Sequence, residues 1–346
     1  MKAMVLHKTS DFYRNSQPLE LVDMPLPVPG EKEVLIKVTR CGVCHTELDE
    51  IEGRTAPSHF PIILGHQIIG KVERRGNKAE RFGIGERVGV GWIYSACGKC
   101  RFCIEGKENL CHEFMATGRD SNGGYAEYTV VSEDFAYKIP EIFSDSEAAP
   151  LLCAGAIGFR SLKLTGLHDG ENLGLTGFGA SGHIVLKIVQ YKYPNSRVFV
   201  FSRTEAEREF AREMGAFWTG DTEEKPPENL AAIIDTTPAW KPVVKALRNL
   251  ERGGRLVINA IRKEERDKGA LLEIDYPRDL WMEKEIKSVA NITRKDVEEF
   301  LALSAEIPSR PEIQEYTLIE ANRALLDLKN RKIRGAKVLR INPGVA

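Results

Sequence analysis

The strongest constraint on the fold is an alternation of strand-like and helix-like segments between residues 172 and 260. Four short apolar runs are strand-like: NLGLTG (172–177), RVFVFS (197–202), AAIIDT (231–236) and GRLVINA (254–260). Helical patterns separate them: SGHIVLKIVQYK (181–192), EAEREFAREMG (205–215) and WKPVVKALRNL (240–250). Strands that alternate with helices form a parallel sheet joined by crossover helices. This stretch therefore predicts an α/β domain with a doubly wound parallel sheet.

The first 140 residues have a different pattern. Apolar runs such as VLIKV (34–38), IIGKV (68–72) and YAEYTVV (125–131) are separated by Gly and Pro, which is typical of irregular β structure. A strand at the very end, AKVLRIN (336–342), is expected to join this mostly β part. The 346 residues correspond to about two domains by the usual domain size.

A glycine-rich loop, GFGASG, lies between the first strand and the first helix of the alternating region. In this setting the first glycine makes the turn, the second admits a pyrophosphate and the third packs the helix on the strand. The loop ends at a helix N-terminus, where phosphate binds. The loop residues predicted to bind a dinucleotide are Gly177, Gly179, Ala180, Ser181 and Gly182.

The residues at the end of the second strand-like run, RVFVFS, indicate whether NAD or NADP binds. An acidic residue there would bind the ribose hydroxyls of NAD, but Ser202 and Arg203 occupy the place. A hydroxyl followed by a guanidinium suits a 2′-phosphate, so we favour NADP over NAD. The alternative is that Glu205 or Glu207 serves the ribose.

Four cysteines lie within fifteen residues, in SACGKCRFCIEGKENLC (95–111). Their spacing lets four thiolates meet on one ion, and a closed tetrahedral shell of four cysteines is typical of a structural zinc site. An iron–sulfur cluster is the alternative. The ligands of this predicted site are Cys97, Cys100, Cys103 and Cys111.

Three further residues are weak signals one by one. Cys44 lies in CGVCHTELDE, His66 in GHQIIG and Cys153 in LLCAG, each beside a glycine or at an expected strand end. Together they offer one imidazole and two thiolates with an open fourth position, which is the pattern of a catalytic zinc.

The order of these motifs resembles the zinc-dependent alcohol dehydrogenases of the medium-chain dehydrogenase/reductase family, in their microbial form. The resemblance spans the chain. It implies a GroES-like mostly β catalytic domain over residues 1–154 and 292–346, and a Rossmann domain over 155–291. It also implies that Cys44, His66 and Cys153 hold the catalytic zinc, that Thr46 accepts the alcohol proton and that Trp92 walls the substrate pocket.

Four positions depart from the family pattern. Glu47 stands where the family commonly has an aspartate that holds the zinc histidine, and Gln67 replaces a glutamate close to the metal. Asp49 stands at the place of a histidine that forms the solvent end of the proton relay in many members. In family members a C-terminal arginine can reach the cofactor pyrophosphate. Its place aligns with Ala336 in this chain, which leaves Arg334 as a candidate for cofactor binding.

The function that these motifs favour is reversible oxidation of an alcohol to an aldehyde or ketone, with hydride transfer to NAD(P). A polyol, sugar or cinnamyl-type dehydrogenase is one alternative. A zinc-stabilised NADP-binding module without turnover is another, because Glu47, Gln67 and Asp49 are altered.

Composition excludes other classes of function. The 49 basic and 50 acidic residues leave no charge excess for nucleic acid or anionic membrane. No run approaches the roughly 18 apolar residues of a membrane span, and the first residues do not form a signal peptide. We therefore expect a soluble cytoplasmic protein with a small-molecule substrate. The apolar strand in GRLVINA favours a homodimer or homotetramer.

Overall fold

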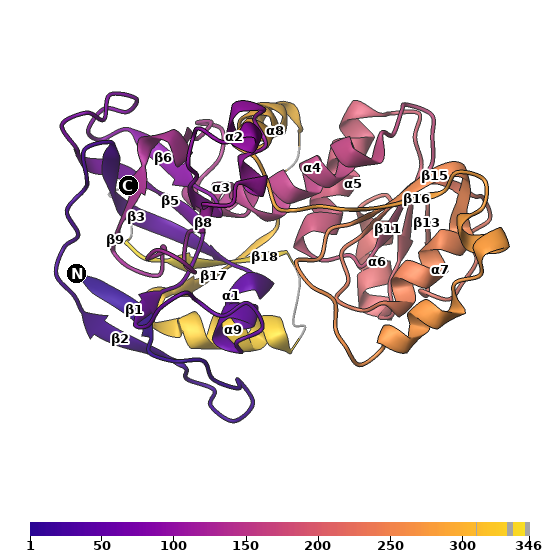
Figure 1. Cartoon of the computed structure of the whole chain (residues 1–346), viewed down its shortest axis with the longest axis horizontal. Helices are drawn as coiled ribbons and strands as arrows, with labels where there is room; N and C mark the ends of the chain where they lie inside the picture. Colours follow the sequence, from indigo (N-terminus) through magenta and orange to yellow (C-terminus); the bar gives the residue numbers. More distant parts are fainter. Residues whose placement is uncertain (309, 331–334, 343–346) are drawn as a thin grey trace. The chain divides into compact units, whose positions relative to one another are not determined.

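The computed structural model describes residues 1–308, 310–330 and 335–342, and Arg334 lies outside this range. These residues form two compact units, Met1–Cys153 with Ile292–Ala346, and Ala154–Asn291. Figure 1 shows both units. Among the described residues, no helix is long and apolar enough to cross a membrane.

The first unit is built on a seven-stranded, mostly antiparallel sheet. Its order is β10-β6-β5-β3-β18-β17, and β9 also pairs with β3. The strands are Glu33–Val43 (β3), Gln67–Arg75 (β5), Arg87–Val90 (β6), Tyr128–Ser132 (β9), Ala136–Lys138 (β10), Ile313–Thr317 (β17) and Ala336–Arg340 (β18). The closing strand β18 pairs with β3, as the sequence predicted.

Two smaller sheets complete this unit. β2 (Leu19–Asp23), β1 (Lys2–Leu6) and β4 (Ile62–Ile63) form one, and β7 (Ile93–Ser95) pairs with β8 (Met115–Ala116) in the other. The core between the sheets contains buried side chains from β1, β3, β5 and β9, among them Leu6, Ile36, Ile68 and Val131. The large antiparallel sheet fits the alternating apolar runs that predicted β structure.

Short helices connect the strands of the first unit. They are α1 (His45–Ile51), α2 (Arg101–Ile104), α3 (Asp145–Ala148), α8 (Arg294–Glu306) and α9 (Ala321–Lys329), with single 3₁₀ turns η1 (Glu108–Leu110), η2 (Glu133–Phe135), η3 (Ala149–Leu152) and η6 (Leu318–Glu320). A capping box in which Thr293 and Asp296 bind each other's backbone N–H starts α8. Helix α1 matters most for function, because the segment CHTE forms its beginning.

The second unit is a six-stranded parallel sheet of order β13-β12-β11-β14-β15-β16. The strands are Leu173–Thr176 (β11), Val198–Phe201 (β12), Trp218–Gly220 (β13), Leu230–Asp235 (β14), Leu250–Ile258 (β15) and Glu285–Ser288 (β16). The chain runs outward from β11 to β13 and then returns to β14 on the other side. With right-handed crossovers this reversal places helices on both faces, which is the doubly wound arrangement predicted.

The helices of the second unit are α4 (Ala154–Thr165), α5 (Ala180–Lys192), α6 (Glu205–Glu213) and α7 (Lys241–Asn249). A 3₁₀ turn (Lys268–Glu273) and a π turn (Tyr276–Leu280) precede β16. Strands β11 and β12 are buried throughout, as expected of the middle of a parallel sheet. By contrast, all four residues of the outer strand β16 are exposed.

Candidate active site and metal centres

Cys44, His66 and Cys153 come from three separate parts of the first unit and meet at one point. Cys44 is the N-cap residue of α1, His66 directly precedes β5, and Cys153 directly follows η3. One ligand atom from each lies within 4.8 Å of the others, and His66 Nε2 is 3.2 Å from Cys153 Sγ. The structure therefore brings together the three residues that the sequence assigned to a catalytic zinc.

The two thiols of this cluster differ in acidity. The contact with Cys153 lowers the pKa of Cys44 well below its ordinary value, and Cys44 in turn raises the pKa of Cys153. A thiolate is the form of cysteine that binds metal. Two cysteine sulfurs and one imidazole are ligands that Zn²⁺ accepts in proteins, so the donor set fits Zn²⁺.

Glu47 supports the imidazole from the side opposite Cys153. Its Oε1 lies 2.7 Å from His66 Nδ1, its Oε2 accepts a 2.7 Å hydrogen bond from the backbone N–H of Cys44, and both side chains are buried. A carboxylate at Nδ1 keeps the proton there and leaves Nε2 as the metal ligand. The extra methylene of Glu47 therefore does not prevent it from reaching the histidine.

Gln67 follows His66 on β5 and is also buried. Its side chain covers Gly42 on β3, where an added Cβ would lie 2.7 Å from Gln67 Oε1. The side chain of Gln67 therefore packs against the backbone of β3 at Gly42.

Thr46 and Trp92 were predicted to act on the substrate. Thr46 Oγ1 lies 3.5 Å from Cys44 Sγ, so the hydroxyl faces the metal cluster from the first turn of α1. Trp92 is buried, its ring is 4.9 Å from the ring of Phe114, and the guanidinium of Arg119 lies 5.4 Å from its centre. The indole ring of Trp92 therefore packs against an aromatic ring, Phe114, and against a charged group, the guanidinium of Arg119.

Asp49, which stands at the place of the histidine at the solvent end of the proton relay, is buried in the structure. Only 10% of its side chain is exposed, and its Oδ1 accepts a 2.5 Å hydrogen bond from Arg54 Nε. The backbone N–H groups of Arg54 and Thr55 also donate to the carbonyl of Asp49. Asp49 holds the chain where it leaves α1, because the following turn brings Arg54 back onto it.

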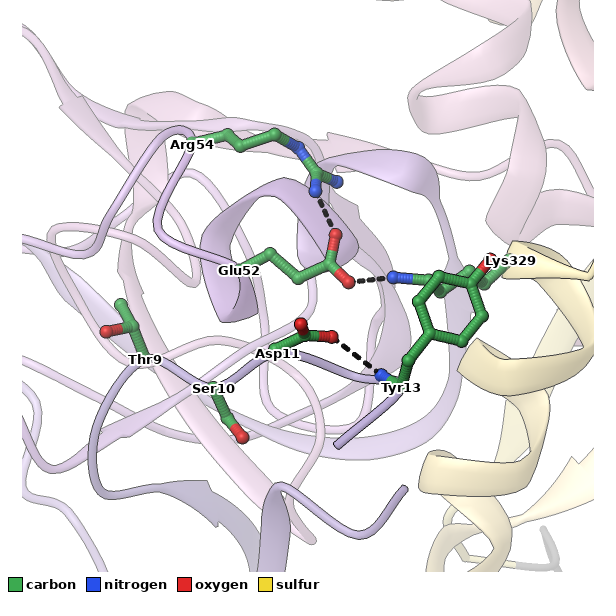
Figure 2. Close-up of a pocket in the computed structure, with 7 residues that line it drawn as sticks. All are labelled: Thr9, Ser10, Asp11, Tyr13, Glu52, Arg54 and Lys329. Atoms are coloured by element: carbon green, nitrogen blue, oxygen red, sulfur yellow. Dashed lines mark hydrogen bonds and ion pairs between the residues drawn. The ribbon is translucent and has the colours of Figure 1, made fainter. Parts of the chain in front are cut away.

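A polar pocket of about 400 Å³ lies next to this turn. Figure 2 shows Glu52 between two cations, Arg54 and Lys329, and both form ion pairs with its carboxylate. Lys329 also lies 4.0 Å from the centre of the Tyr13 ring. Each of these two cations is already paired with Glu52, so the pocket does not offer a free charge to an anion.

The second metal cluster contains all four predicted cysteines. One sulfur from each of Cys97, Cys100, Cys103 and Cys111 lies within 4.8 Å of the others, and the Cys100–Cys103 sulfur distance is 3.6 Å. A tetrahedron with Zn–S bonds of ~2.3 Å has edges of ~3.8 Å, which matches a single ion. The multi-iron alternative would need sulfurs farther apart, so the geometry favours zinc.

The glycine loop forms the expected cradle at the carboxyl end of β11. Gly177 has a φ of +82°, and a Cβ there would lie 2.7 Å from Thr236 Oγ1, after β14. Gly179 is the N-cap of α5 and faces open space, while a Cβ on Gly182 would meet the carbonyl of Gly177 at 3.0 Å. Ala180 and Ser181 form the first turn of α5. This backbone fits a pyrophosphate at a helix N-terminus.

The prediction for the end of β12 needs a correction at Ser202. Its side chain is buried, and its hydroxyl donates to a carboxylate oxygen of Glu207 on α6. The hydroxyl proton of Ser202 is therefore used in the hydrogen bond to Glu207 and is not available to a phosphate. Arg203 is exposed and has no hydrogen-bond or ion-pair partner in the part of the chain that the structure describes.

One acidic residue that the sequence analysis did not select is Glu50. It lies on α1 one turn after Thr46 and is fully buried. The sequence does place Glu50 four residues after Thr46, on the same side of a helix. However, four acidic residues between positions 47 and 52 suggest an exposed helix face. Only the tertiary structure shows that this face is covered.

Comparisons with known proteins identify the family of this chain. Residues 30–141 match the family model of the alcohol dehydrogenase GroES-like domain. A protein named "Probable alcohol dehydrogenase AdhA" from Mycobacterium tuberculosis is 39% identical over 329 residues, which cover 94% of this chain and 93% of that protein.

Two solved structures share the fold. An alcohol dehydrogenase from the archaeon Aeropyrum pernix has a TM-score of 0.86 at 24% identity, covering 99% of this chain and 100% of that one. A protein named CAD from Helicobacter pylori, solved with NADP(H), has a TM-score of 0.85 at 23% identity, covering 98% and 97%.

The fold and the two ligand clusters together define a medium-chain dehydrogenase/reductase. Within that class, the chain belongs to the alcohol dehydrogenase family, as its identity to the mycobacterial protein over nearly the whole length shows. It is an enzyme of alcohol oxidoreduction.

Proposed function

We propose that this chain interconverts alcohols and aldehydes or ketones with NADP, using a zinc ion held by Cys44, His66 and Cys153. The observation that carries the proposal is the convergence of one imidazole and two thiols within 4.8 Å. Three protein ligands leave one position of a tetrahedral zinc open, as catalysis requires. The four-cysteine cluster would hold a second, structural zinc.

The residues around the open position have defined roles. When bound, zinc supplies Lewis-acid chemistry that makes an alcohol oxygen acidic near neutral pH, and NADP⁺ accepts the hydride. Thr46 Oγ1, 3.5 Å from Cys44 Sγ, is placed to accept the alcohol proton. Glu47 fixes the orientation of His66, and Trp92 with Phe114 forms an apolar wall that excludes water.

The preference for NADP rests on Arg203. The exposed guanidinium of Arg203 lies two residues after β12 and has no partner among the described residues, so it suits the 2′-phosphate. The Helicobacter pylori protein of the same fold was solved with NADP(H). Glu207 favours the opposite preference, because its carboxylate would repel a phosphate and could accept hydrogen bonds from the ribose of NAD. We give Arg203 more weight than Glu207 in predicting the cofactor, because the carboxylate of Glu207 already accepts a hydrogen bond from Ser202.

Metal analysis and an alcohol panel test this function together. We expect about two zinc ions per purified chain, and NADPH formation from ethanol, 2-propanol and benzyl alcohol that a chelator abolishes. A zinc-stabilised binding module without turnover would hold zinc and bind NADPH, yet oxidise none of the alcohols and reduce none of the aldehydes. That outcome would contradict the proposal.

We also propose that the enzyme is a homodimer or homotetramer of the cytoplasm. None of the seven cysteines, all of which lie in the described residues, forms a disulfide, as expected in a reducing compartment. The strand of GRLVINA, β15, is not at the sheet edge, because it pairs with both β14 and β16. The edge strand is β16, whose residues are exposed, among them Ile286, and the exposed Tyr276 and Trp281 precede it in the chain. An unpaired strand edge of this kind is suited to pairing with a second copy. Sedimentation velocity at several concentrations would show a monomer if this is wrong.

A further inference from the structure

Asp235 and Lys263 form a buried ion pair at the carboxyl end of the parallel sheet. Asp235 is the last residue of β14, and Lys263 lies in the loop after β15. None of the Asp235 side chain and only 7% of the Lys263 side chain is exposed. The cost of removing two charges from water can exceed their mutual attraction, so a buried pair is weak evidence for a stabilising role. The groups that the pair binds are therefore the better guide to its role.

The ammonium group of Lys263 is fully occupied within the protein. Its Nζ donates to Asp235 Oδ2, to the carbonyl of Thr237 at 2.7 Å and to the carbonyl of Ala239 at 3.0 Å. These three acceptors use all three N–H groups of a lysine. Lys263 therefore has no donor left for a bound phosphate, and what it does hold is the backbone of the segment 235–239.

Further hydrogen bonds fix the same segment. The backbone N–H of Asn259 donates to the carbonyl of Asp235 at 2.8 Å, and that of Glu264 donates to the carbonyl of Pro238 at 2.7 Å. Thr237 Oγ1 donates to Asp235 Oδ1 at 2.8 Å. The turn after β14 is therefore held both by its own side chains and by the loop after β15.

The segment 235–239 packs directly on the glycine loop. The backbone N–H and the hydroxyl of Thr236 both donate to the carbonyl of Thr176, at 3.0 and 2.9 Å, and Thr176 directly precedes Gly177. A Cβ on Gly177 would lie 2.7 Å from Thr236 Oγ1 and 3.2 Å from Thr237 Cγ2. Because the two segments are in contact, a shift of the turn after β14 would displace the glycine turn.

This contact lies where the strand order of the sheet reverses. β11 and β14 are neighbours in the order β13-β12-β11-β14-β15-β16, and Thr176 is paired with Asp235 in the register of the two strands. Dinucleotides bind to open parallel sheets outside the carboxyl ends of the strands, at the point of reversal. The glycine loop follows one of these two strands, and the segment held by Lys263 follows the other.

We propose that Lys263 is a positioning residue for the dinucleotide cofactor, and that it acts with Asp235 by fixing the segment 235–239 against the glycine loop. The inference rests on the proposed dehydrogenase function, which supplies the dinucleotide. NAD and NADP share the pyrophosphate that the glycine loop is expected to bind, so Lys263 affects both cofactors equally. Arg203, assigned to the 2′-phosphate, affects the binding of NADP alone.

The test measures the dissociation constants of NADPH and NADH for the purified, zinc-containing protein by calorimetry. Lys263→Met keeps an unbranched side chain and removes the ammonium group. If the segment then adopts its native conformation in about a tenth of the molecules, both dissociation constants rise by roughly 10-fold and their ratio is unchanged. In cofactor-free protein, amide hydrogen exchange should become faster in residues 235–239 and 177–182, which reports the displacement without any bound cofactor.

A double variant separates positioning from the burial of charge. Lys263→Met alone leaves the charge of Asp235 buried and unpaired, which lowers stability. Adding Asp235→Asn removes the second charge, so the melting temperature should recover. The double variant still lacks the hydrogen bonds to Thr237 and Ala239, so both dissociation constants should stay raised.

Lys284→Met is the matched control. The ammonium group of Lys284 also donates to two backbone carbonyls of the same unit, those of Leu247 at 2.8 Å and Arg278 at 3.3 Å, and both lie outside the segment 235–239. Its loss should lower the melting temperature and leave the dissociation constants of NADPH and NADH unchanged.

The outcomes distinguish this inference from the function on which it rests. A double variant with the stability and both cofactor affinities of the wild type would overturn the role of Lys263. An equal loss of affinity in Lys284→Met would also overturn it, because any destabilisation of this unit would then weaken binding. A wild-type protein that binds neither NADPH nor NADH would instead contradict the dehydrogenase function.

Discussion

Glu47 Oε1 lies 2.7 Å from Nδ1 of His66, with both side chains removed from solvent. The same carboxylate binds the backbone N–H of Cys44, so one side chain fixes two of the three candidate ligands. Burial raises the pKa of Glu47 and His66 counteracts the shift, as expected for a carboxylate that shares a proton with the imidazole. These two contacts explain how Glu47, which is longer than the usual aspartate, still orients His66 and Cys44.

The first prediction concerns this contact. Glu47→Gln removes the negative charge behind His66, and we expect the affinity of the catalytic site for zinc to fall by about 10- to 100-fold. Glu47→Asp keeps the charge but shortens the reach, so it should weaken binding less. Competition with a chelator measures both variants. Equal zinc affinity of wild type and Glu47→Gln would show that Glu47 does not orient the histidine.

The second prediction concerns the four-cysteine cluster. Cys103→Ser should release the structural zinc and lower the melting temperature by roughly 5–10 °C, because metal binding free energy in such sites is folding free energy. The catalytic zinc should remain, since its ligands lie elsewhere. Cys41→Ala is the control, because Cys41 is buried but belongs to neither cluster. An unchanged melting temperature in Cys103→Ser, or loss of both zinc ions, would be inconsistent with a separate structural site.

The third prediction is a pH dependence of stability that comes from Glu52. Its pKa is lowered below the ordinary value, because Lys329 and Arg54 outweigh the effect of burial. Its contribution is therefore present above the pKa of the unfolded chain and is lost as the pH falls through the lower folded pKa. At pH 7 we expect the free energy of unfolding of the wild type to exceed that of Glu52→Gln by on the order of 1 kcal/mol. Urea titrations should show this difference disappearing toward pH 3, and a constant difference would refute the ion pairs.

The fourth prediction tests the cofactor. Arg203→Leu removes the cation that we assign to the 2′-phosphate, and a charge-assisted contact of this kind is worth about 1.5–3 kcal/mol. The ratio of kcat/KM for NADP⁺ over NAD⁺ should therefore fall by roughly 10- to 150-fold. Glu207→Gln should shift the ratio in the opposite direction. A wild-type enzyme that prefers NAD⁺ would make Glu207 the ribose ligand and remove Arg203 from the site.

The sequence predicted the parts of the site that follow from local spacing. The four cysteines 97, 100, 103 and 111 and the loop from Gly177 to Gly182 are each contained in one short segment, so their geometry follows from nearby backbone. Cys44, His66 and Cys153 are far apart in sequence and were predicted through the order of several motifs and not through any one of them. The two-unit fold followed from the contrast in hydrophobic pattern between the first 140 residues and the alternating region that begins at residue 172.

Tertiary contacts decide what the sequence could not predict. Asp49 stands where many family members have the histidine at the solvent end of the relay, but the turn after α1 brings Arg54 onto it. Ser202 was expected to offer its hydroxyl to a phosphate, but α6 brings Glu207 within hydrogen-bonding reach. Glu50 looked like part of a charged helix face, yet it is fully buried. In all three cases the packing of the folded chain, and not the spacing of residue types along the sequence, decides what the side chain meets.

The central claim is that Cys44, His66 and Cys153 form a catalytic zinc site, and His66→Ala tests it most directly. The measurement is zinc content and NADPH formation from an alcohol on the same purified sample, with NADPH binding as the control for folding. We predict that the variant retains one zinc ion, in the four-cysteine cluster, still binds NADPH and oxidises no alcohol. Full zinc content with undiminished alcohol oxidation in His66→Ala would contradict the account.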